Sequence, residues 1–412
     1  MKNQQVDVLI IGAGPSGAVS AAYLHKQGFQ VKVVEKSKFP RFVIGESLLP
    51  RCMHHFEEVG LIDALMEQNF EKKRGARFMR GDKVCNFDFS KKYTEGWDWT
   101  WQVPRADFDK TLTDTLTAWG IDVAFELEVV AVAFDGSDST TTIKDADGQL
   151  SAVSAKYIVD SSGHGRVLPR LLDLDAPSEM PKHASIFTHV KDVKRPTGQE
   201  GTIITFDIVS RETWLWVIPF SNGYTSIGFV GPTEYLESFE GDNTQKLQKM
   251  LSLSHYYFDR FDKIDYEFEP RIIKNIAKSV KKLYGDGFVL TGNSAEFLDP
   301  VFSSGVTFAT ESSLVAAKLI ARELKGEKVD WENEYASYMK RGVNVFSTYV
   351  KEWYTGNLQT IFFDSNENPV IKAQICAVLA GYVWDLSNPF VKNHHRLVKT
   401  VARIAEMEKE VD

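Results

Sequence analysis

The stretch VDVLIIGAGPSG, residues 6–17, decides the fold of this chain. Its first six residues form a β-branched apolar run typical of a strand buried on both faces in a parallel sheet. A helical stretch from Ala18 to Lys26 follows, and a second strand from Phe29 to Val34 ends in Glu35. The order strand, glycine turn, helix, strand predicts a βαβ unit of a doubly wound α/β fold.

Three glycines and an acid give this unit the pattern of a dinucleotide site. Gly12 permits the tight turn, Gly14 lets the backbone approach a pyrophosphate, and Gly17 lets the helix pack closely on the strand. The helix N-terminus beside Ser16 offers amides and the positive end of a dipole to phosphate. Glu35 stands about twenty residues on, where a carboxylate can bind a ribose. The unit therefore predicts dinucleotide binding, and the alternative is an ordinary glycine turn.

Composition narrows the remaining classes. The chain has 412 residues, 43% hydrophobic and 25% charged, with a net charge of −8. This length suggests roughly two or three domains, and an acidic balance without basic blocks argues against nucleic-acid binding. Cys52, Cys85 and Cys376 form no CxxC pair, so we expect neither disulfides nor a metal site. With no apolar run of about 18 residues and no signal peptide, we expect a soluble cytoplasmic protein without a transmembrane segment.

Later segments resemble the remaining motifs of flavoprotein hydroxylases and halogenases. Residues 286–293 form an apolar strand ending in Gly292-Asn293, and DPVFSSGV, residues 299–306, precedes a helix from about Thr307 to Lys325. In that family an acid after the glycine meets the ribityl chain of FAD. Asn293 keeps a hydrogen-bonding oxygen and loses the charge.

Two further segments have the same family character. YIVDSSG, residues 157–163, resembles the motif that closes the cofactor site, and VPRADFD, residues 103–109, resembles the family's arginine-bearing helix start. Taken alone, these segments could be a strand-terminating turn and a surface arginine. The resemblance implies FAD as the cofactor. It implies as FAD-binding residues Gly12, Gly14, Ser16, Gly17, Glu35, Lys36, Arg41, Glu46, Ser47, Arg105, Asp160, Gly163, Gly292, Asn293, Pro300, Gly305 and Val306.

The order of these motifs predicts an interrupted cofactor domain. The resemblance implies an FAD-binding, doubly wound domain of the glutathione-reductase type, made of residues 1–70, 101–180 and 276–330. Short alternating runs indicate an antiparallel β substrate domain, residues 71–100 and 181–275. Apolar spacing predicts a helical C-terminal segment, residues 331–412.

Three pieces point within the family to flavin-dependent halogenases. FPRFVIGESLLP, residues 39–50, resembles a loop that lies along the flavin in halogenases and in the related prenyl reductases. WLWVIP, residues 214–219, matches the halogenase sequence WxWxIP, although a buried aromatic strand would read the same way. In KKRGA, residues 72–76, Lys73 matches a lysine of the tunnel between flavin and substrate, and the alternative is a solvated basic turn.

The resemblance implies a role for each of the expected catalytic residues. Amides around Ser304 and Gly305 would bind halide, and Trp214 and Trp216 would form a wall between flavin and substrate. Lys73 would hydrogen-bond the oxidant as an ammonium, or form a chloramine if burial lowered its pKa. Trp97, Trp99 and Trp101 are further candidates for this wall.

The expected activity is a two-component halogenase that uses reduced FAD, oxygen and halide. A separate flavin reductase is expected because the sequence has no second dinucleotide motif. Phe302 stands where the tryptophan-halogenase branch carries a glutamate, which favours a phenol or pyrrole, free or tethered to a carrier protein, over an indole. The alternatives are an FAD-dependent hydroxylase or prenyl-type reductase that uses no halide, and a non-catalytic flavin-binding protein.

Overall fold

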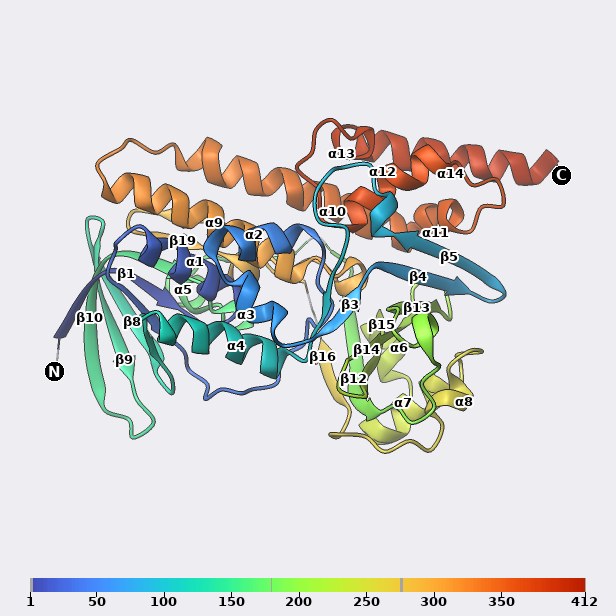
Figure 1. Ribbon diagram of the computed structural model, residues 1–412, viewed down its shortest axis with the longest axis horizontal. Coiled ribbons are helices and arrows are strands. Elements are labelled where there is room, and N and C mark those ends of the chain that lie inside the picture. The colour runs from blue at the N-terminus through green and yellow to red at the C-terminus, as the bar shows by residue number, and fades with distance from the viewer. Residues whose placement is uncertain (1–2, 179, 275–276, 412) are drawn as a thin grey trace.

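The computed structural model describes residues 3–178, 180–274 and 277–411 and shows a mixed α/β protein with two main sheets (Figure 1). The larger sheet runs in the order β18-β19-β10-β1-β2-β7, with β1 (Asn3–Ile11) parallel to both of its neighbours. Strands β8 and β9 extend it beside β10. Its other strands are β2 (Val31–Val34), β7 (Asp122–Ala124), β8 (Glu128–Asp135), β9 (Asp138–Lys144), β10 (Leu150–Asp160), β18 (Tyr284–Gly285) and β19 (Phe288–Leu290). β9 and β10 pair antiparallel, with Asp147-Gly148 in the turn between them.

The predicted βαβ unit is present as β1, α1 (Pro15–Lys26) and β2. The helix begins three residues earlier than expected, because proline suits the first helical turn, where no backbone N–H is needed. Gly12 has a φ of 99°, and a Cβ there would lie 2.5 Å from the carbonyl oxygen of Ser161. Only glycine therefore fits this turn.

Helices cover the larger sheet, and α1 packs against α2, α4 and α9. The long helix α9 starts near the carboxyl ends of the central strands, close to the turn η4 that follows β19. The elements of this layer are α2 (Arg51–Val59), α3 (Ile62–Met66), α4 (Arg105–Ala118), η2 (Gly163–Gly165), α5 (Val167–Leu171), η4 (Gly292–Ser294), η5 (Pro300–Phe302) and α9 (Gly305–Leu324).

The second sheet has the order β16-β12-β15-β14-β13-β4-β5 and lies beside the first (Figure 1). Its strands are β4 (Gly75–Arg80), β5 (Lys83–Asp88), β12 (His183–Lys191), β13 (Thr205–Ile208), β14 (Trp214–Pro219), β15 (Tyr224–Pro232) and β16 (Arg271–Lys274). The expected antiparallel arrangement needs one correction, because β13 pairs parallel with β4. These two strands belong to different excursions of the chain, so no hairpin forces them to run in opposite directions.

Two short ribbons mark where the chain passes between the sheets. β3 (Glu71–Lys73) pairs with β6 (Thr100–Gln102), and β11 (Asp175–Ala176) pairs with β17 (Ser279–Val280). In each ribbon, the strand that leaves the larger sheet lies beside the strand that returns. The second sheet also carries α6 (Thr233–Glu237), α7 (Asn243–Leu251) and α8 (Phe258–Phe261), together with η3 (Gly198–Gly201).

The C-terminal part is helical, as predicted, and crosses both sheets at the top of Figure 1. It contains the π-helical turn η6 (Glu332–Ala336), α10 (Ser337–Thr355), α11 (Asn357–Phe362), α12 (Pro369–Leu379), α13 (Pro389–Lys392) and α14 (His394–Val411). Helix α12 contacts β5 and the turn η1 (Phe89–Lys91).

Among the described residues, no helix is both long and apolar enough to span a bilayer. The three cysteines are free and buried. Of the predicted domain limits, residues 1, 275, 276 and 412 lie outside the described residues.

Candidate functional site

The glycine turn between β1 and α1 forms an open cradle at the carboxyl edge of the larger sheet. Gly14 is the N-cap of α1 and makes no side-chain capping bond, so the first amides of the helix have no partner within it. A Cβ on Gly14 would lie 3.9 Å from Nη2 of Arg41. Glu35 accepts a hydrogen bond from the Ala13 amide at 3.0 Å. Free amides, a backbone without side chains and a nearby carboxylate fit the pyrophosphate and ribose of FAD.

Two arginines meet one buried carboxylate beside this cradle. Arg105, the first residue of α4, binds both oxygens of Asp109 at 2.9 Å, and Arg41 binds Asp109 at 3.1 Å. Arg105 also donates to the carbonyls of Ile44 and Gly45, each at 3.2 Å. Arg41 also lies 3.8 Å from Glu35, so two carboxylates face the two guanidinium groups. The arginines therefore offer N–H donors suited to phosphate, without a net positive charge.

Several expected FAD-binding side chains are engaged elsewhere. The hydroxyl of Ser16 lies in a buried cluster with those of Ser161, Thr291 and Ser313. Asp160 accepts from the amides of Ser162 and Leu168, at 2.9 and 2.7 Å. Ser16 and Asp160 therefore hold the loops of the site together.

Lys36 points away from the site, where its exposed side chain pairs with Glu128 at 2.7 Å. Gly17 packs α1 on the turn, since a Cβ there would lie 2.0 Å from the carbonyl oxygen of Gly12. Gly163 opens η2 with a φ of 59°.

The segment around the start of α9 completes the edge of the site. The backbone amide of Gly292 donates to Ser312 Oγ. The side-chain nitrogen Nδ2 of Asn293 lies 3.3 Å from Nε2 of His164. Pro300 opens the turn η5, which ends at Ser303 with a φ of 57°.

Helix α9 itself starts uncapped. Ser304 is its N-cap and makes no side-chain capping bond, while Gly305 and Val306 form the first turn. Thr307 Oγ1 is buried and has no hydrogen-bond partner among the described residues. Uncapped amides and an unpartnered hydroxyl can bind an anion or the polar atoms of a cofactor.

Lys73 is buried, and the solvated basic turn is wrong for this residue. It is 2% exposed, and its Nζ donates to Ser47 Oγ at 2.8 Å and to the Leu48 carbonyl at 2.9 Å. Burial lowers the pKa of Lys73 to about 7. Its neighbours Lys72 and Arg74 are exposed, as strand alternation requires. The structure therefore joins Lys73 to the 39–50 loop.

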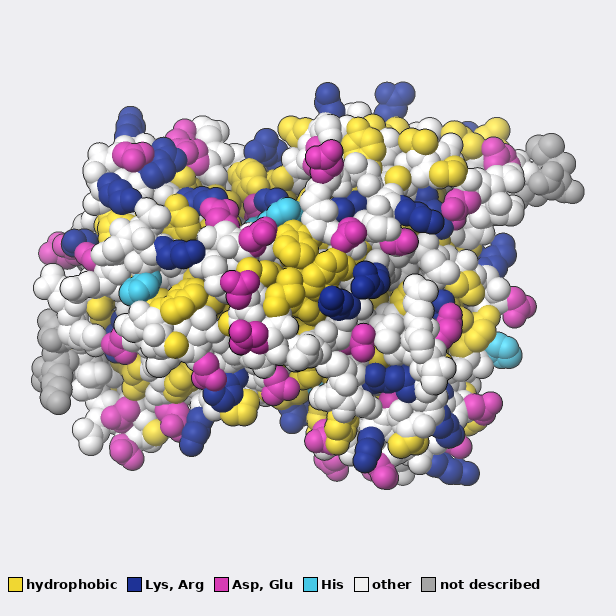
Figure 2. Space-filling view, viewed as in Figure 1, with side chains coloured by type: hydrophobic (Ala, Val, Ile, Leu, Met, Phe, Trp, Pro, Cys, Tyr) yellow, Lys and Arg dark blue, Asp and Glu magenta, His cyan; other side chains and the backbone are white. Residues whose placement is uncertain are grey.

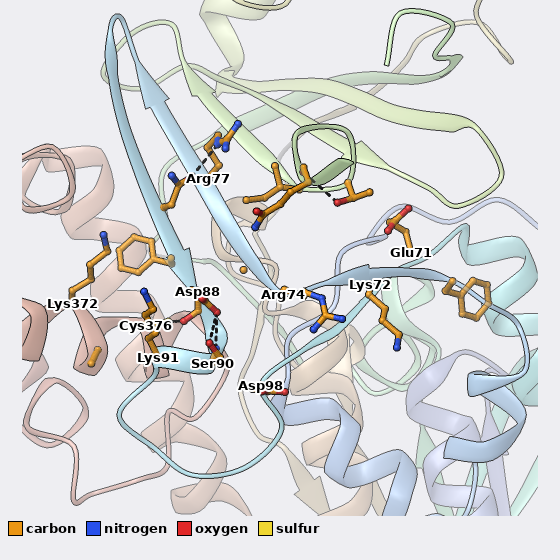
Figure 3. A pocket seen from close by; sticks show the side chains of 18 of the residues that line it. Glu71, Lys72, Arg74, Arg77, Asp88, Ser90, Lys91, Asp98, Lys372 and Cys376 are labelled. Carbon is orange, nitrogen blue, oxygen red and sulfur yellow. Dashed lines mark hydrogen bonds between the residues drawn. The ribbon is translucent and has the colours of Figure 1, made fainter. Parts of the chain in front are cut away.

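The exposed side of β3 and of the residues that follow it lines a cleft of about 1450 Å³. Figure 3 shows Lys72 and Arg74 on one side of it and Lys91, Lys372 and Cys376 on the other. The cleft thus lies between β3–β5 and α12, with Lys73 behind its wall.

Trp214 and Trp216 lie two positions apart on β14 and belong to the same buried cluster. Their ring centroids are 6.2 Å apart. Trp214 Nε1 donates to the hydroxyl of Tyr354 at 3.1 Å, and Trp216 Nε1 donates to Ser226 at 3.0 Å. Both indoles are fixed, as a wall requires.

The other three tryptophans expected in the wall follow one another as a ladder that packs into the same core cluster. Trp97 and Trp101 each lie 5.4 Å from Trp99 between ring centroids, and Lys72 lies over the Trp99 ring. Trp97 and Trp99 are only half-buried. On the face in Figure 2, apolar side chains gather near the middle.

Sequence reasoning placed Glu46 at the cofactor but missed its partner. Its buried carboxylate meets Nε2 of His189 on β12, and Glu46 Oε2 has no partner within the described part of the chain. Also missed were His183, Asp299 and Tyr354, which form a buried network with Trp214. These groups are far apart in sequence, and no local motif marks their contact.

Together, the fold and this edge define an FAD-binding protein. The chain belongs to the FAD binding domain family, whose model matches residues 5–345. FAD, expected from the motifs, is thus supported by a match to most of the chain.

Similar proteins carry more specific names. A 1H-pyrrole-2-carbonyl-[peptidyl-carrier protein] brominase from Pseudoalteromonas luteoviolacea is 27% identical and covers 92% of each chain. The corresponding chlorinase from Pseudomonas fluorescens is 26% identical and covers 93% of this chain and 91% of its own. A solved structure of a flavoprotein/dehydrogenase from Cytophaga hutchinsonii is 50% identical, with a TM-score of 0.97 over 98% of this chain and all of that one. The resemblance to flavin-dependent halogenases is confirmed.

Proposed function

We propose that this protein is an FAD-dependent halogenase of an electron-rich aromatic compound, a phenol or a pyrrole. The observation that carries the proposal is the placement of Lys73. Its buried ammonium group is anchored to Ser47 of the 39–50 loop on one side, and the strand that bears it lines the cleft on the other. A lysine buried between the 39–50 loop and the cleft suits the transfer of an oxidant from the flavin to a substrate in the cleft.

FAD would lie across the glycine cradle, between Arg105 and the start of α9. Gly12, Gly14 and the first turn of α1 would hold its pyrophosphate, with Arg41 and Arg105 supplying N–H donors. When bound and reduced, FAD would supply two of the four electrons that reduce oxygen, and the halide, oxidised to hypohalous acid, would supply the other two.

The halide would bind at the N-terminus of α9. The amides of Gly305 and Val306 lack helical partners, and oriented amides at a helix N-terminus stabilise an anion. The side chain of Ser304 makes no capping bond to these amides, so it leaves them accessible.

Lys73 would then hold and orient hypohalous acid. Because burial lowers its pKa to about 7, the side chain exists as both ammonium and amine near neutral pH. The ammonium form donates a hydrogen bond to the oxidant oxygen, which makes the halogen more electrophilic. Trp214 and Trp216, both buried on β14, would keep water from competing for the oxidant.

We further propose the domain organisation expected from the sequence. The FAD-binding domain is of the doubly wound type, residues 1–70, 101–180 and 276–330. The inserted substrate domain comprises residues 71–100 and 181–275, and the helical segment 331–412 closes the cleft. The two ribbons at β3–β6 and β11–β17 support this division, because each joins the sheets where the chain crosses.

The substrate class follows from the region around α9. Phe302 is buried against Trp353 and Tyr349, so no carboxylate stands at this position to assist an indole. Phenols and pyrroles activate their own rings through oxygen or nitrogen lone pairs. Since the bacterial relatives act on a pyrrole held by a carrier protein, a thioester-linked pyrrole is included among the substrates to test.

The test is product formation with a separate flavin reductase, NADH, FAD, oxygen and a panel of phenols, pyrroles and pyrrolyl thioesters. Bromide-dependent appearance of a brominated product supports the proposal. Turnover that adds oxygen or hydrogen in the absence of halide would instead assign a hydroxylase or reductase. The halide-free control is necessary because the similar Cytophaga protein is named a flavoprotein/dehydrogenase and not a halogenase.

A further inference from the structure

A buried chain of hydrogen bonds joins four side chains behind the start of α9. The hydroxyl of Tyr354 donates a hydrogen bond to the carboxylate of Asp299, 3.1 Å from each oxygen. It accepts a hydrogen bond from Trp214 Nε1 at 3.1 Å. Nδ1 of His183 lies 3.0 Å from the same carboxylate. None of the four residues is more than 7% exposed. Such a network has one preferred arrangement, since each buried polar group depends on its neighbour.

Asp299 also holds the turn that leads into α9. Its Oδ1 accepts the amide of Val301 at 3.0 Å, which makes it the N-cap of the turn η5. The turn ends at Ser303, whose φ of 57° lies in the left-handed region. A serine in that conformation costs about 1 kcal/mol, so the surrounding contacts must hold it there. The amides of α9 begin directly after this residue.

The network ties three parts of the molecule to that turn. His183 is on β12 and Trp214 on β14 of the second sheet, while Tyr354 is in the last turn of α10 in the C-terminal segment. The hydroxyl of Tyr354 is the link between Trp214 and Asp299. Removing it takes a donor from a buried carboxylate and the acceptor from a buried indole, and both losses are costly in a protein interior.

We propose that Asp299 and Tyr354 are positioning residues for the anion site at the N-terminus of α9. They hold residues 299–305 in the conformation that aims the first amides of α9, and they couple it to Trp214. The identity of the anion as halide rests on the proposed function, whereas the positioning of the turn does not.

The first test measures the turn itself and needs no halide. Amide hydrogen exchange of the FAD-loaded protein is compared for Tyr354→Phe and Tyr349→Phe. Tyr349 is the matched control, because it is buried on the same helix and its hydroxyl has no partner among the described residues. We expect exchange over residues 299–307 to rise about tenfold in Tyr354→Phe only. Equal exchange in the two variants would overturn the proposal.

The second test measures the anion. Bromide is titrated into the oxidised holoprotein and followed by the flavin absorbance, and the bromide dependence of turnover is measured alongside. We expect Tyr354→Phe to raise the bromide concentration at half-saturation about tenfold, with kcat at saturating bromide changed less than about twofold. A loss confined to kcat would contradict a positioning role.

Asp299→Asn provides a second variant in case Tyr354→Phe does not fold. An asparagine keeps an oxygen for Val301 and loses the charge, so the same two changes are expected in weaker form. If the wild-type holoprotein binds no bromide, the halide function fails. Hydrogen exchange still decides whether the turn depends on Tyr354.

Discussion

Nζ of Lys73 lies 2.8 Å from Oγ of Ser47, so a side chain of the ribbon that joins the sheets is bonded to the loop beside the FAD cradle. The same Nζ reaches the Leu48 carbonyl at 2.9 Å. Two neutral acceptors orient the lysine without cancelling its charge. This contact places the group expected to hold the oxidant between the cofactor loop and the wall of the cleft.

Replacing Lys73 should separate flavin oxidation from product formation. In Lys73→Ala we expect halogenation to fall at least about a hundredfold, as for loss of a positioned catalytic group, while reduced FAD is still consumed. Product is measured by mass spectrometry and oxygen uptake by an electrode. Lys72→Ala is the matched control, because its side chain is exposed on the same strand. Unchanged halogenation in Lys73→Ala would remove Lys73 from the chemistry.

The pKa of Lys73 predicts how stability changes with pH. Because burial lowers its pKa from 10.5 to about 7, the unfolded chain binds more protons than the folded protein between these two values. The contribution of Lys73 to the free energy of unfolding therefore increases as pH rises from about 7 to about 10.5, by at most about 5 kcal/mol. Urea unfolding of wild type and Lys73→Met at pH 7 and 9 measures the difference. The unfolding free energy of wild type minus that of Lys73→Met should be larger at pH 9 than at pH 7, and a smaller value at pH 9 would contradict this sign.

The halogenation rate should depend on pH through Lys73 in the opposite direction to stability. If the ammonium form of Lys73 donates to the oxidant, the halogenation rate falls as pH rises through about 7. The rate profile of product formation at saturating bromide checks this expectation. A rate that rises across the same interval would indicate that the neutral amine is the working form.

Gly12 and Gly28 offer a matched comparison within the βαβ unit. Both have a positive φ, but a Cβ on Gly12 would lie 2.5 Å from the carbonyl oxygen of Ser161, while Gly28 faces open space. Gly28→Ala should cost about 1 kcal/mol of unfolding free energy and keep FAD affinity. Gly12→Ala should abolish FAD binding, because the cradle backbone must move. Equal FAD affinity in the two variants would contradict this account of the turn.

The motifs assigned both Arg105 and Lys36 to FAD binding, but the structure places their side chains in different surroundings. Arg105 is buried and bonded to Asp109 and the 39–50 loop, whereas Lys36 is exposed and paired with Glu128. We expect Arg105→Met to weaken FAD binding at least about tenfold and Lys36→Met to leave it unchanged. Fluorescence titration of the apoprotein with FAD measures both. A weaker site in Lys36→Met would restore the role expected for it from the sequence.

Local sequence predicted the parts of the site that depend on neighbouring residues. The turn at Gly12 and Gly14 follows from a pattern of a few residues, whereas Lys73 was expected at the site only from the resemblance to halogenases. Contacts between distant segments could not be predicted in this way. Asp299 is 55 positions from Tyr354 and 116 from His183, and only the packing of three structural parts brings them together.

The same limit explains the correction in the second sheet. The hairpin at Asn222-Gly223 follows from its turn residues, and β14 and β15 pair accordingly. The parallel pairing of β13 with β4 joins strands from two excursions, which no turn sequence specifies. Helix starts were likewise predicted to within a few residues, as at Pro15 of α1.

The most direct test of the proposed function is bromide-dependent product formation by the holoprotein with a flavin reductase. In wild type, we predict products carrying the two-isotope pattern of bromine on a phenol or pyrrole ring, present only when bromide is supplied and reduced at least about a hundredfold in Lys73→Ala. Products that contain added oxygen or hydrogen, formed at the same rate without any halide, would contradict the account.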